Sequence, residues 1–340
     1  KIPLHLKQAN IPREEFEYGP QRSIMLEFAD TFPEQDFQLW MDVNDELRES
    51  KPGSLRTFAN EMLDQKYDGF LMCQEWFSGN YVKYWNMRFV RSRSGWRFKG
   101  RIHEWPKNIK RERDEDGPQA YRIDFPDHPI LYQDRTQDDD KTGKRFPNDK
   151  KLLLKDYQDD PSDTRTLFYL AQTCGCLEQF DEAFYYYKLR AELEGFWEER
   201  FHALNRCGEY SVKMGHPWVD SMGYFIRAFE VSPRVEPMIE ITRHYMAEKN
   251  WLLAFTFCDL ACKLTYPSHL LLFVNKQEYE YDRWHLMGII GYHAGFHNEG
   301  KSACLRALEC KRLRHPLDEE NLRKYQEKER EKENRELQVL

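Results

Sequence analysis

Apolar positions in the first 140 residues fall into short runs that are separated by polar turns. One run, built on Phe37, Leu39 and Trp40, ends in a cluster of carboxylates. Short apolar runs of this kind predict buried strands, and a helix is expected to begin at Glu46 and Leu47. The pattern predicts further helices at residues 22–31 and 55–65 and further strands at 70–73, 81–90 and 130–132. This alternation predicts an α/β domain over residues 1–140.

From residue 148 onward the pattern becomes helical, and it repeats. Trp284, Met287 and Gly288 are followed by Gly300 and Ala307, at the small-residue spacing of a tetratricopeptide helix pair. Small residues are needed where two antiparallel helices come close together. Weaker copies run through Gly208, Ala228 and Pro233, and through Ala254, Ala261 and Pro267.

Residues 148–316 are therefore predicted to form tetratricopeptide-like helical repeats, with an unrelated helical bundle as the alternative. Helix pairs of this kind stack because one pair alone cannot bury its apolar face. Residues 317–340 lack a sustained heptad and predict a polar, solvated capping helix.

The composition argues against a nucleic-acid-binding, a membrane-spanning or a secreted protein. The 340 residues carry a formal net charge of −7, and 32% of them are charged. This balance gives no overall basic surface for nucleic acid. No stretch approaches the roughly eighteen apolar residues of a membrane span. The start lacks a signal peptide, and the eight cysteines contain no CxxC pair. A cytoplasmic protein with no nucleic-acid partner is expected.

Two short segments carry candidate chemistry. Asp42 and Asp45 follow the first predicted strand, where carboxylates can hold a divalent cation and, through it, a nucleotide's phosphates. The alternative is that Asp42 only caps the next helix. His103 and Glu104 are adjacent in a segment with Trp96 and two glycines, where a general base or a metal ligand is one interpretation. An ordinary surface pair is the other.

Three segments in order carry a resemblance to a known family. They are residues 40–47, residues 95–104, and residues 152–154 with 160–172. Together they resemble family 2 glycosyltransferases whose nucleotide-sugar domain is fused to tetratricopeptide repeats, which occur in bacteria and in large DNA viruses. The resemblance covers most of residues 14–230 and implies a partial GT-A-like domain at residues 1–140.

The resemblance implies roles for individual residues. The family's acidic metal motif falls on residues 42–47, with Asp42 and Asn44 at its metal-facing positions and Asp45 beside them. His103 would be a further metal ligand, and Glu104 the catalytic base. Arg22 stands where the family carries an arginine before the metal strand, with a phosphate-binding or structural role.

The resemblance also implies a reaction and partners. The enzyme would transfer a sugar from a nucleotide-sugar donor to a hydroxyl of a glycan or protein acceptor, with inversion at the anomeric carbon. Mg²⁺ or Mn²⁺ would neutralise the departing diphosphate.

Two departures from the family leave two interpretations of the chain open. Asn44 replaces an expected Asp, and nothing in residues 1–36 resembles the family's nucleotide-binding segment. The chain is then either part of a longer protein or a degenerate, non-catalytic scaffold, such as a viral assembly protein in the host cytoplasm or virion. A third hypothesis is an adaptor whose repeat groove binds a peptide. The aromatic residues considered for that groove are Tyr185, Tyr186, Phe201 and Tyr210.

Overall fold

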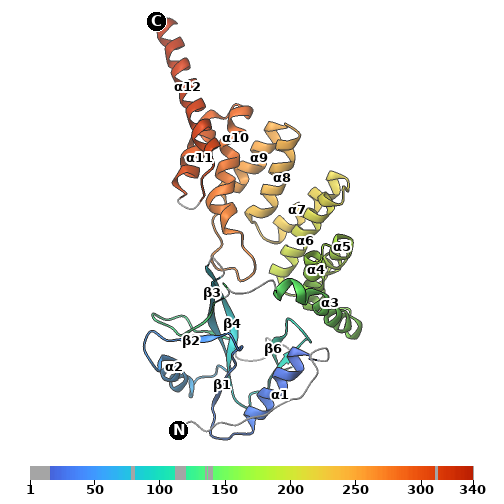
Figure 1. The fold of residues 1–340 in the computed structure, drawn as a ribbon. Coiled ribbons are helices and arrows are strands. Elements are labelled where there is room, and N and C mark those ends of the chain that lie inside the picture. Colours follow the sequence, from blue (N-terminus) through green and yellow to red (C-terminus); the bar gives the residue numbers. More distant parts are fainter. Residues whose placement is uncertain are drawn as a thin grey trace. The chain divides into compact units, whose positions relative to one another are not determined.

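The structure is a computed structural model that describes residues 16–77, 81–111, 120–134, 136, 141–310 and 313–339. The chain divides into two compact units, Lys1–Leu177 and Glu178–Leu340. The first contains a small β-sheet with helices, and the second consists of helices (Figure 1).

A mixed sheet forms the centre of the first unit, with strand order β1-β4-β3-β8-β2 and β7 beside β3. The longest pairing is the antiparallel one between β3 and β4, whereas β3 runs parallel to β8 and β7. The strands are β1 (Phe37–Leu39), β2 (Glu46–Arg48), β3 (Gly69–Phe77), β4 (Tyr81–Arg91), β7 (Tyr121–Arg122) and β8 (Ile130–Asp134).

The prediction of a GT-A-like α/β domain around a buried parallel strand is wrong. β1 is a three-residue strand at one end of the sheet, and it pairs antiparallel with β4. Glu46 and Leu47 do not begin a helix, because they belong to β2 and pair antiparallel with β8. Pairing with strands distant in the sequence has overridden the local helical pattern.

Aromatic residues fill the core on one face of this sheet. Phe58 of α2 (Ser54–Met62) packs edge-on against Phe70 of β3, and their ring centroids are 5.5 Å apart. Both side chains are buried, together with Met72, Phe89, Ile123 and Leu131. The apolar side of α2 and the apolar positions of the sheet therefore bury one another.

Two further pieces complete the first unit. α1 (Tyr18–Asp30) packs against β5 (Trp96–Lys99), which forms a separate antiparallel pair with β6 (Trp105–Asn108). α3 (Lys141–Asp159) packs against α4 (Thr164–Cys176). The side chain of Asp163 caps α4 by accepting a hydrogen bond of 2.9 Å from the backbone N–H of Thr166.

The second unit is built from antiparallel helix pairs, so the prediction of helical repeats is confirmed (Figure 1). α6 packs against α7, α8 against α9, and α10 against α11. The helices are α5 (Phe180–Glu192), α6 (Trp197–Lys213), α7 (Trp218–Val231), α8 (Val235–Ala247), α9 (Trp251–Lys263), α10 (Arg283–Ala294), α11 (His297–Glu309) and α12 (Pro316–Val339).

Glycines permit the close helix contacts that the repeat pattern requires. A Cβ added to Gly208 of α6 would lie 2.5 Å from the ring of Phe225 on α7. A Cβ added to Gly288 of α10 would lie 2.7 Å from Sγ of Cys304 on α11. These contacts are shorter than van der Waals distance, so each helix pair packs closely because one partner has no side chain there.

Two segments of the second unit fall outside the regular pairs. Residues 264–277 after α9 are largely irregular, and they lead into the π-helical segment η2 (Glu278–Asp282), which directly precedes α10. α12 packs on α11 and α10, where Tyr325 is buried and its hydroxyl donates a hydrogen bond of 2.8 Å to the carbonyl oxygen of Gly288. No helix in the described parts of the chain is long and apolar enough to cross a membrane.

Candidate functional site

Four of the residues singled out in the sequence belong to one ion-pair network in the first unit: Arg22, Asp42, Asp45 and Glu104. Arg22 on α1 lies between two carboxylates. Its Nε is 2.7 Å from Oε1 of Glu104, and its Nη2 pairs with Oδ1 of Asp42. Arg22 therefore joins the helix α1 to the turn after β1 and to the residue before β6.

Arg88 of β4 extends this chain of charges. Its guanidinium lies 3.0 Å from Oδ2 of Asp42 and 3.7 Å from Oδ2 of Asp45. Asp45 also accepts a hydrogen bond from the side-chain amide of Gln74 and one from that of Gln133. The order Glu104, Arg22, Asp42, Arg88, Asp45 alternates in sign, so each arginine is neutralised by two carboxylates.

The pKa values of the two carboxyl groups next to Arg22 are shifted in opposite directions. Burial alone would raise the pKa of Asp42, but Arg88 and Arg22 hold it below its usual value. Burial raises the pKa of Glu104, and Arg22 only partly opposes that rise. Asp42 is thus held as a carboxylate between two cations, which is the pattern of an ion-pair network that joins structural elements.

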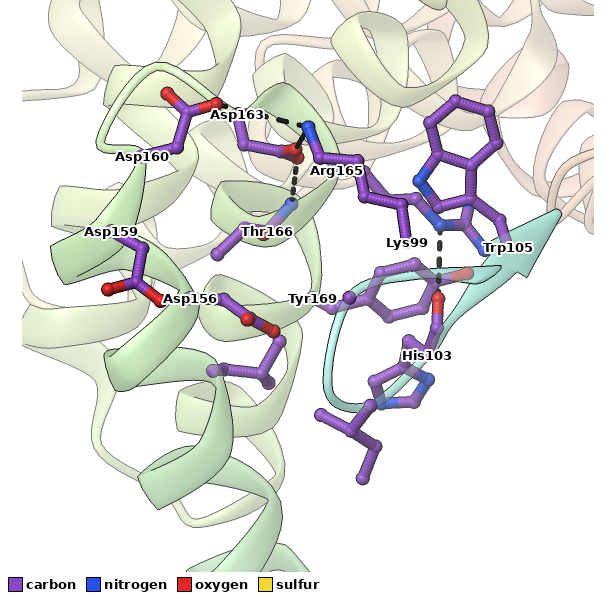
Figure 2. A pocket seen from close by; sticks show the side chains of 13 residues that line it. Lys99, His103, Trp105, Asp156, Asp159, Asp160, Asp163, Arg165, Thr166 and Tyr169 are labelled. Carbon is purple, nitrogen blue, oxygen red and sulfur yellow. Dashed lines mark hydrogen bonds and ion pairs between the residues drawn. The ribbon is translucent and has the colours of Figure 1, made fainter. Parts of the chain in front are cut away.

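His103 does not join this network, although Glu104 follows it directly. Its imidazole stacks on the ring of Tyr169, with centroids 4.0 Å apart and planes 7° apart, and its carbonyl accepts a hydrogen bond of 3.1 Å from Arg165 (Figure 2). Burial, with Arg145 and Arg165 nearby, lowers the pKa of His103 to about 3. The imidazole is therefore neutral near pH 7.

The pocket beside His103 is small and its charges are largely neutralised internally. It has a volume of about 130 Å³. Lys99 projects from β5 toward α4 and pairs with Asp163, the residue that also caps α4 (Figure 2). Arg101 pairs with Asp156 and Asp159 on α3 at 2.6 and 2.7 Å. These contacts join β5 and the residues that follow it to the helices α3 and α4.

The proposed metal ligands do not converge. Asp42 is paired with two arginines, Asn44 is exposed in the following turn, and His103 is stacked on Tyr169. Among residues 16–77, 81–111, 120–134, 136, 141–310 and 313–339, no group of three or more His, Cys, Asp or Glu side chains is placed to hold a metal ion.

The sequence interpretation missed the residues that complete the network. Arg88 lies between Met87 and Phe89 in a strand, and Gln74 and Gln133 lie in β3 and β8. All three side chains are buried. The sequence does place these long polar side chains inside apolar strands. A polar group buried in this way requires a partner, so the pattern indicates a polar network.

A larger groove lies in the second unit. It has a volume of about 570 Å³ and is lined by the first helices of two successive pairs, α6 and α8, and by residues 273–278. Of the four aromatic residues considered for the adaptor's groove, Phe201 lines it, whereas Tyr185, Tyr186 and Tyr210 do not. The lining residues are Phe201, His202, Asn205, Arg206, Glu209, Val212, Arg234, Glu236, Glu240, Phe273, Val274, Asn275 and Glu278.

Buried charged side chains fix the irregular wall of this groove. Glu198 of α6 accepts hydrogen bonds of 2.9 and 2.7 Å from the backbone N–H groups of Leu271 and Leu272. Glu236 of α8 accepts one of 3.1 Å from the N–H of Asn275. Residues 271–275 are thus held in place by side chains from both neighbouring helices.

No protein-family model and no curated protein sequence matches the chain. Among solved structures, the chain is similar to MamA, with 16% sequence identity, a TM-score of 0.39, and coverage of 51% of this chain and 92% of that one. It is similar to PilF of Pseudomonas aeruginosa, with 13% identity, a TM-score of 0.40, and coverage of 56% and 77%. A tetratricopeptide repeat protein from Parabacteroides merdae gives 11% identity, a TM-score of 0.39, and coverage of 56% and 70%.

The helix pairs and their glycine contacts define a protein with tetratricopeptide-like helical repeats. The resemblance to family 2 glycosyltransferases is wrong, and the predictions of sugar transfer, of an enzyme and of a metal-binding protein are wrong with it. The sheet is mixed, the strand before Asp42 pairs antiparallel at the end of the sheet, and Asp42 is neutralised by arginines. The binding of Mg²⁺ or Mn²⁺ and of a nucleotide sugar as cofactors remains a prediction from the sequence that no observation tests.

Proposed function

We propose that the chain is a non-catalytic adaptor or scaffold whose helical repeats bind a segment of a protein partner. The groove between α6, α8 and residues 273–278 carries this proposal. Stacked helix pairs present concave surfaces of this kind, and such surfaces bind extended or helical peptides.

The lining of the groove supports a peptide as the ligand. Val212 and Phe273 supply exposed apolar surface, while Asn205 and several charged side chains supply hydrogen-bonding groups. Mixed linings let apolar contacts give affinity while polar groups fix the orientation of the ligand. The wall is already held by Glu198 and Glu236, so little ordering of the protein accompanies binding.

A steric block tests the proposal. Val212 lines the groove and is 49% exposed, whereas Val219 of α7 is 73% exposed and lies outside the lining. Short random peptides displayed on phage would be selected on the full chain, and their affinities would be measured for the Val212→Trp and Val219→Trp variants. We expect Val212→Trp to weaken binding at least about tenfold, and Val219→Trp to leave it unchanged. Failure to select any peptide, or equal losses in both variants, would refute the proposal.

A further inference from the structure

An acidic residue at the start of η2 contributes an unsatisfied carboxylate oxygen to the groove. Glu278 lines the groove and is only 8% exposed. Among the described residues, its Oε2 is buried and has no hydrogen-bond partner. Buried oxygens almost always accept a hydrogen bond, so an orphaned one inside a groove indicates a missing donor.

A second orphaned acceptor belongs to the same groove. Asn205 of α6 is 6% exposed, and its side-chain amide donates a hydrogen bond of 2.6 Å to Glu209. Its Oδ1 is buried and, within the described part of the chain, has no partner. Oδ1 of Asn205 is an acceptor, and so is Oε2 of Glu278 in its ionised form, so the ligand group that satisfies both is a donor of N–H or O–H bonds.

The charges around the groove decide which donor fits. Of the described residues, the lining holds four glutamates, Glu209, Glu236, Glu240 and Glu278, and two arginines, Arg206 and Arg234. Arg206 is paired with Glu209 at 2.6 Å, and Arg234 is paired with Glu236. Glu240 is paired with Arg243 of α8, so among these four glutamates of the described lining only Glu278 has no cationic partner.

We infer that the groove receives a lysine or arginine side chain of the partner segment, and that Glu278 accepts hydrogen bonds from its cationic group. This inference rests on the proposed peptide-binding function. An arginine or lysine side chain supplies N–H donors for Oε2 of Glu278 and gives this carboxyl group the cationic partner that the other three glutamates already have. An acidic side chain would be repelled, and an apolar one would leave the acceptors without donors.

The pKa of Glu278 is consistent with a site that lacks its counter-ion. Burial, together with the neighbouring carboxylate of Glu236, raises the pKa of Glu278 to about 8. A cation beside the carboxyl group would favour its ionised form and lower that pKa. The residue also lies in a π-helical segment, a rare helical form that is frequent at functional sites.

Positional peptide libraries on the full chain test the inference. Each library holds heptapeptides that are random except at the centre, where arginine, lysine, norleucine or glutamate is fixed. We expect the arginine and lysine libraries to bind at least about tenfold tighter than the norleucine library. Glu278→Gln should reduce that preference to less than about twofold, whereas Glu230→Gln, an exposed glutamate of α7 outside the lining, should retain it.

The outcomes separate the inference from the proposed function. If the libraries bind equally well, or if Glu278→Gln keeps the full preference, the inference is refuted while peptide binding stands. If no library binds, the proposed function itself is refuted, and the inference with it. A carbon-13 NMR titration of Glu278 gives a second measurement that needs no variant. Its pKa should fall when the arginine library is added, and an unchanged pKa would overturn the inference.

Discussion

The guanidinium group of Arg234 donates a hydrogen bond of 2.7 Å to the backbone carbonyl oxygen of Phe273. Arg234 is 1% exposed, pairs with Glu236, and lies 4.1 Å over the ring of Phe201. Phe273 adopts a left-handed backbone conformation, with φ of 38°, which is strained for a residue with a side chain. The contact with Arg234 helps to hold this strained residue at the edge of the groove.

Replacing Arg234 by methionine should lower the free energy of unfolding by about 3 kcal/mol. The cause is the carboxylate of Glu236, which would stay buried without its cation. Urea unfolding followed by circular dichroism measures the change. Arg243→Met is the matched control, because Arg243 is an exposed arginine on α8 paired with Glu240. The control should lose less than about 1 kcal/mol, and similar losses in the two variants would contradict the role of Arg234.

Glu278 should make the stability of the protein depend on pH. Its pKa is about 8 in the folded chain and near 4.5 when unfolded. A raised pKa means that stability is complete below pH 4.5 and is lost as pH rises through 8. The loss is at most about 5 kcal/mol, since each pKa unit corresponds to about 1.4 kcal/mol. Burial is the largest cause of the raised pKa; Glu236, Glu240 and Asp282 add to it, and Arg243 opposes it.

The Glu278→Gln variant checks this assignment. Glutamine has the same shape and does not ionise, so the variant should lose less stability between about pH 5 and about pH 8 than the parent chain. Thermal unfolding in a series of buffers measures the difference. Parallel stability curves for the two proteins would show that another group causes the dependence.

Two glycine substitutions should change stability in opposite directions. A Cβ at Gly288 meets Sγ of Cys304 at 2.7 Å, so Gly288→Ala should destabilise the protein by about 1–3 kcal/mol. A Cβ at Gly223, on the exposed side of α7, meets no atom within 4 Å. Gly223→Ala should stabilise by about 0.5–1 kcal/mol through the higher helix propensity of alanine. Equal effects in urea unfolding would argue against a close contact between α10 and α11.

The ion-pair network of the first unit predicts a further stability effect. Asp42→Asn should cost about 2 kcal/mol, because Arg88 is 6% exposed and loses a charged partner. The pKa of Asp42 lies below its usual 3.8, so the stabilisation by this group is present above that pH and lost as pH falls. The variant should therefore lose less stability in acid than the parent chain. Glu46→Gln, in a half-exposed pair with Arg48, should change little.

Local pattern was sufficient to predict the helical repeats. Gly208, Gly288 and Gly300 each stand where an added Cβ would meet another element at 2.7 Å or less. This spacing is readable in the sequence because helix pairs contact mainly their neighbours in the chain. The same local approach failed for Glu46 and Leu47, which pair with β8 more than eighty residues later in the chain.

The sequence alone was sufficient to predict the helix pairs and two strands, which the structure places at Gly69–Phe77 and Tyr81–Arg91. It also showed that polar residues cluster around Asp42. Only the tertiary structure decided what those residues do. Arg22 and Arg88 come from different elements and neutralise Asp42, so the apparent metal motif is part of an ion-pair network. The groove likewise depends on residues 271–275, which are held by Glu198 and Glu236. Such contacts join positions far apart in the chain, and no local pattern of residues encodes them.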